Sequence, residues 1–259
     1  DKYIPSWAYE PILLVRALEI PNREVWDAHV MAKKLLFDYV EKTKKVKLDP
    51  QVLTVGFARR ATGYKRSTLI FSDLHRLLEV TRRGRIQMVF AGKAHPRDED
   101  GKRLIKEIYE YAKILKGQIE IVYLENYNMD IAAMLTSGVD VWLNTPIPPM
   151  EASGTSGMKA AHNGVVNFSV LDGWWTEGCV EGVTGWSIGP HPKELVTETE
   201  RREIELRDLY SKLEYLIVPT YYEQREAWIA LMKNSIARIA HYFQIHWVVR
   251  RYITEAYTI

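Results

Sequence analysis

The sequence predicts an α/β protein with a doubly wound, Rossmann-like parallel sheet and a C-terminal helical tail. Three observations carry this prediction: five short apolar segments rich in β-branched residues, helical segments that alternate with them, and a change to charged helical sequence after about residue 190. Strands that are apolar on both faces and alternate with helices are typical of a parallel sheet covered by helices. The 259 residues, of which 47% are hydrophobic, suffice for a sizeable core.

The first predicted element is a helix over residues 23–43, whose apolar residues recur at spacings of about 3.6. Asn22 is available as its N-cap. Residues 51–57 are predicted to form a buried strand, because the segment is apolar and contains β-branched residues. A helix from about 64 to 82 follows, with its apolar residues on one face, and Gly84 ends it.

The same alternation continues to residue 170 and then gives way to helices. Four further strands are predicted at 86–92, 119–124, 139–143 and 165–170. The intervening helices are predicted at 98–116, 129–137 and 156–163. Three more helices are predicted at 197–216, 223–242 and 246–257, in a region punctuated by Pro190, Pro192 and Pro219. We therefore expect a helical lead-in at 1–50, a Rossmann-like domain at 51–190, and C-terminal helices packing on it at 191–259.

Composition excludes several classes of protein. The 35 Lys and Arg residues against 33 Asp and Glu leave a net charge of +2, which argues against a nucleic-acid-binding protein. No apolar run reaches the roughly 18 residues of a membrane span. The single cysteine, Cys179, excludes an internal disulfide and fits a reducing, cytoplasmic location. The seven histidines show no metal-ligand spacing, so no metal site is expected.

Four polar or glycine-containing segments follow the ends of predicted strands, where ligands of open parallel sheets bind. These are residues 58–66, 92–96, 125–128 and 148–159. The first has four cations among nine residues, a pattern typical of anion binding. The second offers Lys93 and His95, and the third offers the ring of Tyr127 and the amide of Asn128.

The fourth segment is the most informative. Residues 153–157, Ser-Gly-Thr-Ser-Gly, lead into a predicted helix, whose free N–H groups form an anion site. Lys159 falls about one turn inside that helix. Near a sheet crevice, burial and neighbouring cations lower a lysine pKa and favour imine chemistry. The pattern therefore fits a pyridoxal phosphate site, and it fits a nucleotide diphosphate site nearly as well.

Longer motifs separate these two readings. Residues 151–159, Glu-Ala-Ser-Gly-Thr-Ser-Gly-Met-Lys, resemble the pyridoxal-phosphate signature of the α-glucan phosphorylases, and residues 160–175 resemble the prokaryotic branch of that family. Further segments resemble the family in the same order, at 26–29, 55–66, 90–96 and 218–222. The resemblance covers almost the whole chain. It implies the second lobe of a GT-B glycosyltransferase fold, and phosphorolysis of terminal α-1,4-linked glucosyl units of glycogen, starch or maltodextrin to glucose 1-phosphate.

The resemblance also implies roles for single residues. Lys159 matches the lysine that anchors pyridoxal phosphate as a Schiff base, while the cofactor phosphate acts as a proton shuttle. Arg60 and Lys65 match catalytic cations that hold the substrate and cofactor phosphates. Two phosphates in contact raise each other's pKa, so that one can donate a proton. The remaining implied contacts are to the cofactor from Tyr127, Thr155, Ser156 and Gly157, and to the sugar from Glu151, Ala152, Ser153 and Gly154.

Two features depart from a complete enzyme of that family. Asn128 stands where animal-type enzymes carry an arginine. The family has two lobes with the site between them, and this chain matches only the cofactor-binding lobe. Because the chain also lacks an initiator Met, we expect it to be part of a longer protein or one half of a split enzyme. An N-terminal lobe, in the same or a separate chain, is the expected partner, with weak cofactor binding and no turnover by this lobe alone.

Two alternative functions remain open at the level of sequence. One is a nucleotide-sugar-dependent glycogen or starch synthase, in which Arg60, Lys65 and Glu151 would serve a nucleoside diphosphate sugar equally well. The position of the lysine after Ser-Gly-Thr-Ser-Gly-Met favours the phosphorylase. The other is a non-catalytic glucan-binding module, in which Trp174 and Trp175 would be stacking platforms. A homo-oligomer is compatible with either function.

Overall fold

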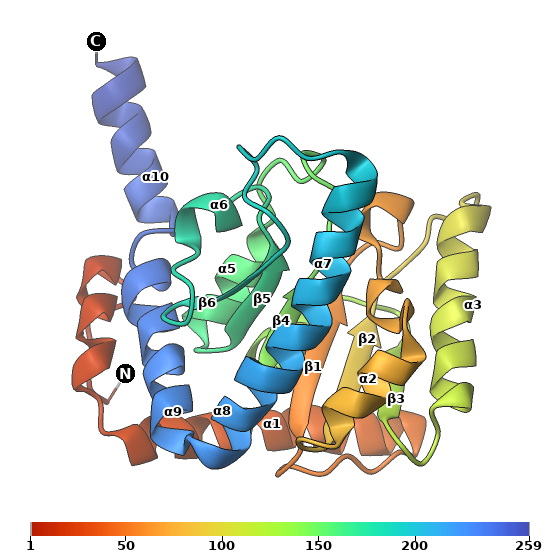
Figure 1. The fold of residues 1–259 in the computed structure, drawn as a ribbon. Helices are drawn as coiled ribbons and strands as arrows, with labels where there is room; N and C mark the ends of the chain where they lie inside the picture. Colours follow the sequence, from red (N-terminus) through yellow and green to blue (C-terminus); the bar gives the residue numbers. More distant parts are fainter. Residues whose placement is uncertain (1, 259) are drawn as a thin grey trace.

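The computed structural model describes residues 2–258, which contain a six-stranded parallel sheet (Figure 1). The strands are β1 Leu53–Ala58, β2 Ile86–Ala91, β3 Glu120–Leu124, β4 Val141–Asn144, β5 Val166–Val170 and β6 Gly185–Ile188. They lie in the order β3-β2-β1-β4-β5-β6, and every neighbouring pair is parallel. The predicted α/β class with a parallel sheet is confirmed.

The strand order reverses direction between β1 and β4. The chain runs from β1 outward to β3, returns to β4 beside β1, and continues outward to β6. Doubly wound folds with this order bind ligands at the reversal, beyond the carboxyl ends of the strands. β1 and β4 pair through only two residue pairs, Val55 with Val141 and Gly56 with Trp142. We call this short junction of the two half-sheets the β1–β4 seam.

Helical segments make up most of the remaining chain. The α-helices are α1 Asn22–Lys44, α2 Leu74–Thr81, α3 Glu99–Ile114, α4 Met129–Gly138, α5 Thr155–His162, α6 Trp175–Gly178, α7 Glu198–Lys212, α8 Val218–Glu223, α9 Arg225–Asn234 and α10 Ile245–Tyr252. The 3-10 segments are η1 Pro11–Glu19, η2 Gly63–Lys65 and η3 Leu69–Phe71. The π-helical segments are η4 Leu213–Ile217, η5 Ser235–Ala240 and η6 Ile253–Tyr257.

Helices cover both faces of the sheet, which makes the fold doubly wound (Figure 1). One core lies between the sheet and helices α2, α3, α7, α8 and α9. The other lies between the sheet and helices α1, α4 and α5. Met88 and Val89, neighbours in β2, belong to different cores, as expected for a strand buried on both faces. This two-sided burial explains why the strands are nearly continuous apolar runs.

The five predicted strands are all present, and β6 is a sixth that the hydrophobic pattern does not predict. It has four residues and includes Gly185 and Ser187. So short a segment, interrupted by glycine and serine, lacks the apolar run by which a buried strand is detected. Among the strands of residues 2–258, β6 pairs with β5 alone and so forms one edge of the sheet.

The predicted continuous helix over 64–82 is wrong in its first half. The turns η2 and η3 precede α2, which begins only at Leu74. Arg66 adopts a left-handed conformation with φ 47° and ψ 50°, which ends the first turn. Asp73 then caps α2, because its Oδ1 accepts from the N–H of Arg76 at 2.9 Å. Lys65 therefore ends the single 3-10 turn η2 and Arg66 follows it, so neither residue lies on a continuous α-helix.

The other predicted helices are present with shifted ends. Asn22 is the first residue of α1, so the prediction that it is the N-cap is wrong; Pro21 takes that position. Asp98 caps α3 by accepting from the N–H of Gly101 at 2.8 Å. The three predicted C-terminal helices each contain a π-helical segment. Pro219 does not separate two helices: α7, η4 and α8 form one continuous helical stretch from Glu198 to Glu223, and the chain leaves helical conformation only at Gln224.

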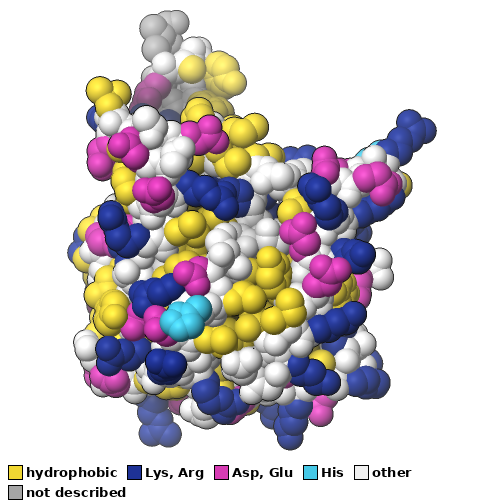
Figure 2. Space-filling view, turned by 45° about the vertical axis from the view of Figure 1, so that its right-hand side comes forward, with side chains coloured by type: hydrophobic (Ala, Val, Ile, Leu, Met, Phe, Trp, Pro, Cys, Tyr) yellow, Lys and Arg dark blue, Asp and Glu magenta, His cyan; other side chains and the backbone are white. Residues whose placement is uncertain are grey.

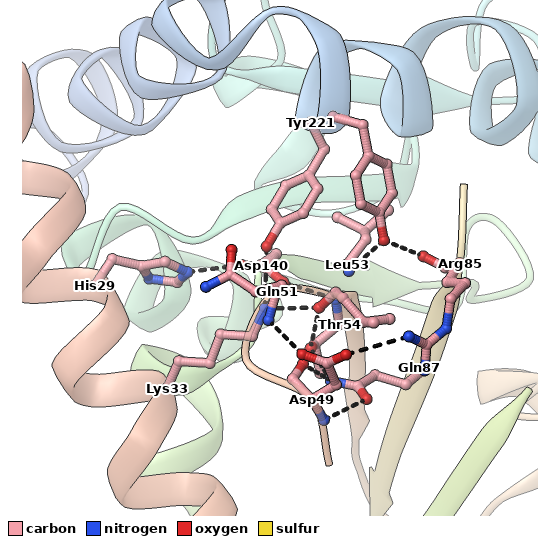
Figure 3. Close-up of polar contacts among 12 residues, drawn as sticks. His29, Lys33, Asp49, Gln51, Leu53, Thr54, Arg85, Gln87, Asp140 and Tyr221 are labelled. Atoms are coloured by element: carbon pink, nitrogen blue, oxygen red, sulfur yellow. Dashed lines mark hydrogen bonds and ion pairs between the residues drawn. The ribbon is translucent and has the colours of Figure 1, made fainter. Parts of the chain in front are cut away.

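A buried polar cluster, here called the Asp140 network, lies at the amino ends of β1 and β4 (Figure 3). Asp140 Oδ1 is 2.8 Å from His29 Nε2, and Oδ2 is 2.6 Å from Lys33 Nζ. The Thr54 N–H also donates to Oδ2, at 2.7 Å. Lys33 Nζ donates further to the Tyr221 hydroxyl at 3.2 Å. The network joins α1, α8 and both strands of the β1–β4 seam.

Burial by itself raises the pKa of the Asp140 carboxyl, but the charge of Lys33 and the hydrogen bond from His29 outweigh burial. The pKa of Asp140 therefore lies below its ordinary 3.8. For Lys33, burial dominates and lowers the pKa of the amine below 10.5, although Asp140 opposes this. The network stands at the opposite edge of the sheet from the strand ends where ligands are expected, so we interpret it as structural.

Charged side chains of both signs are mixed on the face of the molecule shown in Figure 2. Figure 2 shows one face, on which Lys and Arg side chains alternate with Asp and Glu without a continuous basic stripe. Within residues 2–258, no helix has the length and hydrophobicity needed to cross a membrane.

Trp174 and Trp175 are buried beside Ala161 and Ile239. Rings buried in this way cannot stack against a glucan. The prediction that they are stacking platforms, on which the glucan-binding alternative depended, is therefore wrong.

Candidate functional site

The four segments singled out in the sequence all leave the carboxyl edge of the sheet. Residues 58–66 follow β1, residues 92–96 follow β2, residues 125–128 follow β3, and residues 148–159 follow β4 and form the start of α5. Because β1 and β4 flank the reversal of strand order, the first and fourth segments meet at the position expected for a ligand.

The centre of this edge is a buried ion cluster around Glu151. Its Oε2 pairs with Lys65 Nζ and lies 2.8 Å from Arg59 Nη2. Only 8% of Glu151 and 5% of Lys65 are exposed. Arg59 also donates to Asn144 Oδ1, and the Asn144 amide donates to Ser169 Oγ at 3.0 Å. We call Arg59, Lys65 and Glu151 the Glu151 cluster; its Arg59–Asn144 bond spans the β1–β4 seam.

At the Glu151 cluster and beside it, burial and neighbouring groups shift the pKa values of the side chains in opposite directions. Burial lowers the pKa of the Arg59 guanidinium below 12.5, and the carboxylate of Glu151 opposes that effect. Burial raises the pKa of Asp172 above 3.8, although its carboxylate accepts from the N–H groups of Glu151 and Gly173, both at 2.9 Å. Asp172 therefore fixes the backbone of the residue whose side chain joins the two cations. Two cations, Arg59 and Lys65, share the single carboxylate of Glu151, so the buried cluster attracts a further anion strongly.

The start of α5 provides a second anion-binding feature. Gly154, with φ +86°, precedes the helix; no side chain caps it, and its first turn has no acidic residue. The backbone of Gly157 packs closely: a Cβ there would lie 2.6 Å from Asn167 Oδ1 and 2.8 Å from the Trp174 ring. Asn167 also donates to the Gly157 carbonyl at 3.0 Å. The helix start is thus held in place, with its positive end available to a ligand.

The structure brings some of the predicted site residues together and leaves others apart. Lys65 and Glu151 are in contact, whereas Arg60 and Lys159 are exposed and their charged groups have no hydrogen bond or ion pair within the described chain. The remaining predicted residues are exposed Ala152, Ser153 and Thr155, half-buried Gly154, Ser156 and Tyr127, and buried Gly157. Burial raises the pKa of Tyr127 above 10.0, and the charge of Arg59 opposes this shift.

Three contributors were not singled out by sequence reasoning. Arg59 is the first residue after β1, and only its membership of a cation-rich segment signals it. Asn144 ends β4, and its position at a strand end is its signal. Asp172 reaches the site from the segment after β5, and no local pattern reveals this. Asn128 caps α4, because its Oδ1 accepts from the Ile131 N–H at 2.9 Å, a role that an arginine cannot fill.

We expect Glu151→Gln to bind inorganic phosphate about tenfold more tightly than the unaltered chain. Phosphate must otherwise displace a carboxylate from Lys65 and Arg59, whereas a neutral amide leaves both cations available. Titration calorimetry with inorganic phosphate measures this. Glu125→Gln, which removes a half-exposed carboxylate paired with Lys44, is the control and should leave the affinity unchanged. Equal or weaker binding by Glu151→Gln contradicts the competition.

Comparisons with known proteins agree on one family. A sequence model of the family described as carbohydrate phosphorylase matches residues 20–182. Maltodextrin phosphorylase of Thermococcus litoralis is 43% identical over 254 residues, which cover 92% of this chain and 30% of the relative. Glycogen phosphorylase of Aquifex aeolicus is 40% identical over 264 residues, which cover 93% of this chain and 37% of the relative. The chain thus spans about a third of the length of these curated relatives.

Proposed function

The chain belongs to the carbohydrate phosphorylase family, and we propose that it forms the cofactor-binding lobe of an α-glucan phosphorylase. The proposed reaction is attack of inorganic phosphate on a terminal α-1,4-linked glucosyl unit of glycogen, starch or maltodextrin. It yields glucose 1-phosphate and a glucan shortened by one unit. The observation that carries the proposal is the Glu151 cluster at the strand-order reversal. Glu151 itself lies four residues before Thr155, the first residue of the uncapped helix that bears Lys159.

The residues present fit pyridoxal 5'-phosphate. The uncapped start of α5 suits a phosphate group, the Glu151 cluster supplies cations beside it, and Lys159 offers an exposed amine on the same helix. When bound, this cofactor supplies a phosphate group that can donate and accept a proton beside the substrate phosphate. In this proposal Lys159 is the point of covalent attachment, and Tyr127 lies beside the ring.

The chain's own residues then divide the work. The N–H groups of Thr155, Ser156 and Gly157 hold the cofactor phosphate at the positive end of α5. Lys65 and Arg60 hold the phosphates, since two anions close together in a partly buried site repel strongly unless cations neutralise them. We add Arg59 to the proposed phosphate-binding cations, and its ion pair with the Glu151 carboxylate supports this assignment.

Sugar binding is assigned to the segment just before α5. Glu151 accepts hydrogen bonds from sugar hydroxyls, and Ala152, Ser153 and Gly154 contribute further contacts. In this arrangement Glu151 leaves its cations to the phosphates when sugar and phosphate bind together. The two ligands therefore replace the internal ion pairs with charge-assisted bonds of the same kind.

We propose a division of the chain into three segments, as expected for the cofactor-binding lobe of a phosphorylase. Residues 1–50 lead in, residues 51–190 form the Rossmann-like domain, and residues 191–259 are helices that pack on it. We propose that an N-terminal lobe, in the same chain or a separate one, completes the site, since the relatives are about three times as long. The single cysteine, Cys179, supports a location in the reducing cytoplasm. A nucleotide-sugar-dependent synthase is not favoured, because the matched relatives are phosphorylases.

Reductive trapping tests the proposed function. The chain is incubated with pyridoxal phosphate, reduced with borohydride and digested, and the pyridoxyl group is located by mass spectrometry. We expect the label on Lys159 in preference to other lysines, because only this amine stands on the helix whose start binds the phosphate. Inorganic phosphate should reduce the labelling by competition.

Two variants make this result decisive. Lys159→Ala should remove the preferred label completely, whereas Lys193→Ala, which alters another exposed lysine, should leave it in place. Label spread evenly over surface lysines, or unaffected by Lys159→Ala, would reject the proposed cofactor site.

A further inference from the structure

The side chain of Arg66 connects the loop after β4 to helix α7. Its Nε donates to the Thr145 carbonyl at 2.8 Å, and its Nη2 donates to the Pro146 carbonyl at 2.7 Å. Its Nη1 pairs with Glu205 Oε2 at 2.5 Å. A guanidinium group presents its N–H groups in one rigid plane, so three simultaneous contacts fix both the loop and the helix relative to it.

Glu205 is an unusual residue for a charged helix. It is 0% exposed, and within residues 2–258 its Oε1 has no hydrogen-bond partner. Its side chain packs against the backbone after β6: a Cβ on Gly189 would lie 2.5 Å from its Cγ. A buried carboxylate with one cationic partner gains little net stability compared with an apolar pair. The pair therefore needs an explanation other than stability alone.

The backbone around Arg66 reinforces the same connection. Its left-handed φ of 47° is uncommon for a residue with a side chain. The Thr145 hydroxyl lies within hydrogen-bonding distance of the carbonyls of Lys65 at 3.1 Å and Arg66 at 3.0 Å, and the Ile147 N–H donates to the Tyr64 carbonyl at 2.8 Å. Residues 64–66 and 145–147 are thus joined by backbone and side-chain bonds together.

We propose that Arg66 and Glu205 are positioning residues that hold the 145–151 loop so that Glu151 meets its cations. The loop is fixed at its start by Arg66 and at its end by Asp172, which accepts from the Glu151 N–H. Lys65 directly precedes Arg66, so the same bonds set the distance between Lys65 and Glu151. The proposal rests on the proposed function for its ligand, and it assigns α7 a part in shaping the site.

Arg66→Gln tests this role against a matched ion pair elsewhere. Arg76→Gln is the control, because Arg76 pairs with Glu79 at 2.7 Å and with buried Glu214 at 2.9 Å, and its guanidinium group makes no hydrogen bond or ion pair with residues 145–151. Two readouts are used: deuterium exchange of the peptide spanning 145–151, and the pyridoxal phosphate concentration giving half-maximal label on Lys159. For Arg66→Gln we expect exchange and half-labelling concentration each to rise about tenfold, whereas Arg76→Gln changes only the melting temperature.

The double variant Arg66→Gln/Glu205→Gln separates positioning from stability. Removing both charges leaves no buried charge unpaired, so the melting temperature should recover toward that of the unaltered chain. The faster exchange and weaker labelling should remain, because the bonds to the loop carbonyls are still missing. Recovery of all three, or equal effects of Arg76→Gln on the loop, would overturn the proposal. If the unaltered chain fails to label Lys159, the proposed function is rejected, and the exchange readout alone decides the role of Arg66.

Discussion

Replacing Asp140 by alanine is expected to lower the free energy of unfolding by about 3–5 kcal/mol. The change leaves the Lys33 amine buried without its counter-charge and removes the acceptor of the Thr54 N–H and of His29. Breaking a buried pair on one side is costly, because the remaining charge cannot reach water. Urea unfolding followed by far-ultraviolet circular dichroism measures the loss.

Asp49→Ala provides the matched control. Asp49 is a half-exposed carboxylate at the same edge of the sheet and pairs with Arg85 at 3.2 Å. Because solvent screens such a pair, we expect a loss of no more than about 1 kcal/mol. If Asp140→Ala also lowers the free energy of unfolding by no more than about 1 kcal/mol, the buried Asp140 network does not stabilise the fold as proposed. Lys33→Met added to Asp140→Ala should restore part of the stability, since no buried charge then remains.

The same carboxylate predicts how stability depends on pH. The folded pKa of Asp140 lies below 3.8, so its contribution is present above the unfolded pKa and is lost as pH falls through the folded value. Stability of the unaltered chain should therefore fall below about pH 4 more steeply than that of Asp140→Asn, which lacks this group. Equal slopes in the two proteins would show that the shift in pKa is absent.

Replacing Lys65 by methionine in the Glu151→Gln background is expected to weaken phosphate binding about 10- to 100-fold. The background matters, because Lys65→Met alone would leave Glu151 buried with only Arg59 as its counter-charge. In the double variant, the loss reports the charge-assisted bonds that Lys65 makes to phosphate. Titration calorimetry compares the double variant with Glu151→Gln.

The control for Lys65 is another cation of the same sheet edge. Lys93 follows β2, is exposed, and its amine has no hydrogen bond or ion pair in residues 2–258. Lys93→Met in the same background should change phosphate affinity by only a small factor, since an exposed charge is screened by solvent. If both lysines have the same effect, phosphate responds to overall charge, and the Glu151 cluster is not its binding site.

The sequence predicts the parts of this fold that depend on local pattern. The buried strands, the long helices and the loops at the strand ends follow from apolar periodicity and from polar segments between them. The reversal of strand order between β1 and β4 does not follow, because strand order is set by packing of segments far apart in the chain. The broken helix at 64–82 also escapes prediction: its apolar spacing is helical, but the contacts of Arg66 with the loop after β4 hold a different conformation.

The candidate site divides in the same way. Glu151, Lys65 and the start of α5 are identifiable because they belong to recognisable motifs. The contact of Arg59 with both Glu151 and Asn144 is not, because the ends of two strands far apart in the sequence, β1 and β4, must meet before it exists. Asp140 is likewise unremarkable in sequence, and only the fold surrounds it with Lys33, His29 and the Thr54 N–H.

The short β1–β4 seam links the candidate ligand site to the stability of the sheet. The two half-sheets share two residue pairs, and polar side chains bridge them at both ends: Asp140 to Thr54 at one, and Arg59 to Asn144 at the other. The first bridge belongs to the buried Asp140 network, whereas the second belongs to the Glu151 cluster, where phosphate binding is proposed. A phosphate that binds this cluster in the folded chain alone adds its binding free energy to the free energy of unfolding. It thereby stabilises the junction of the two half-sheets.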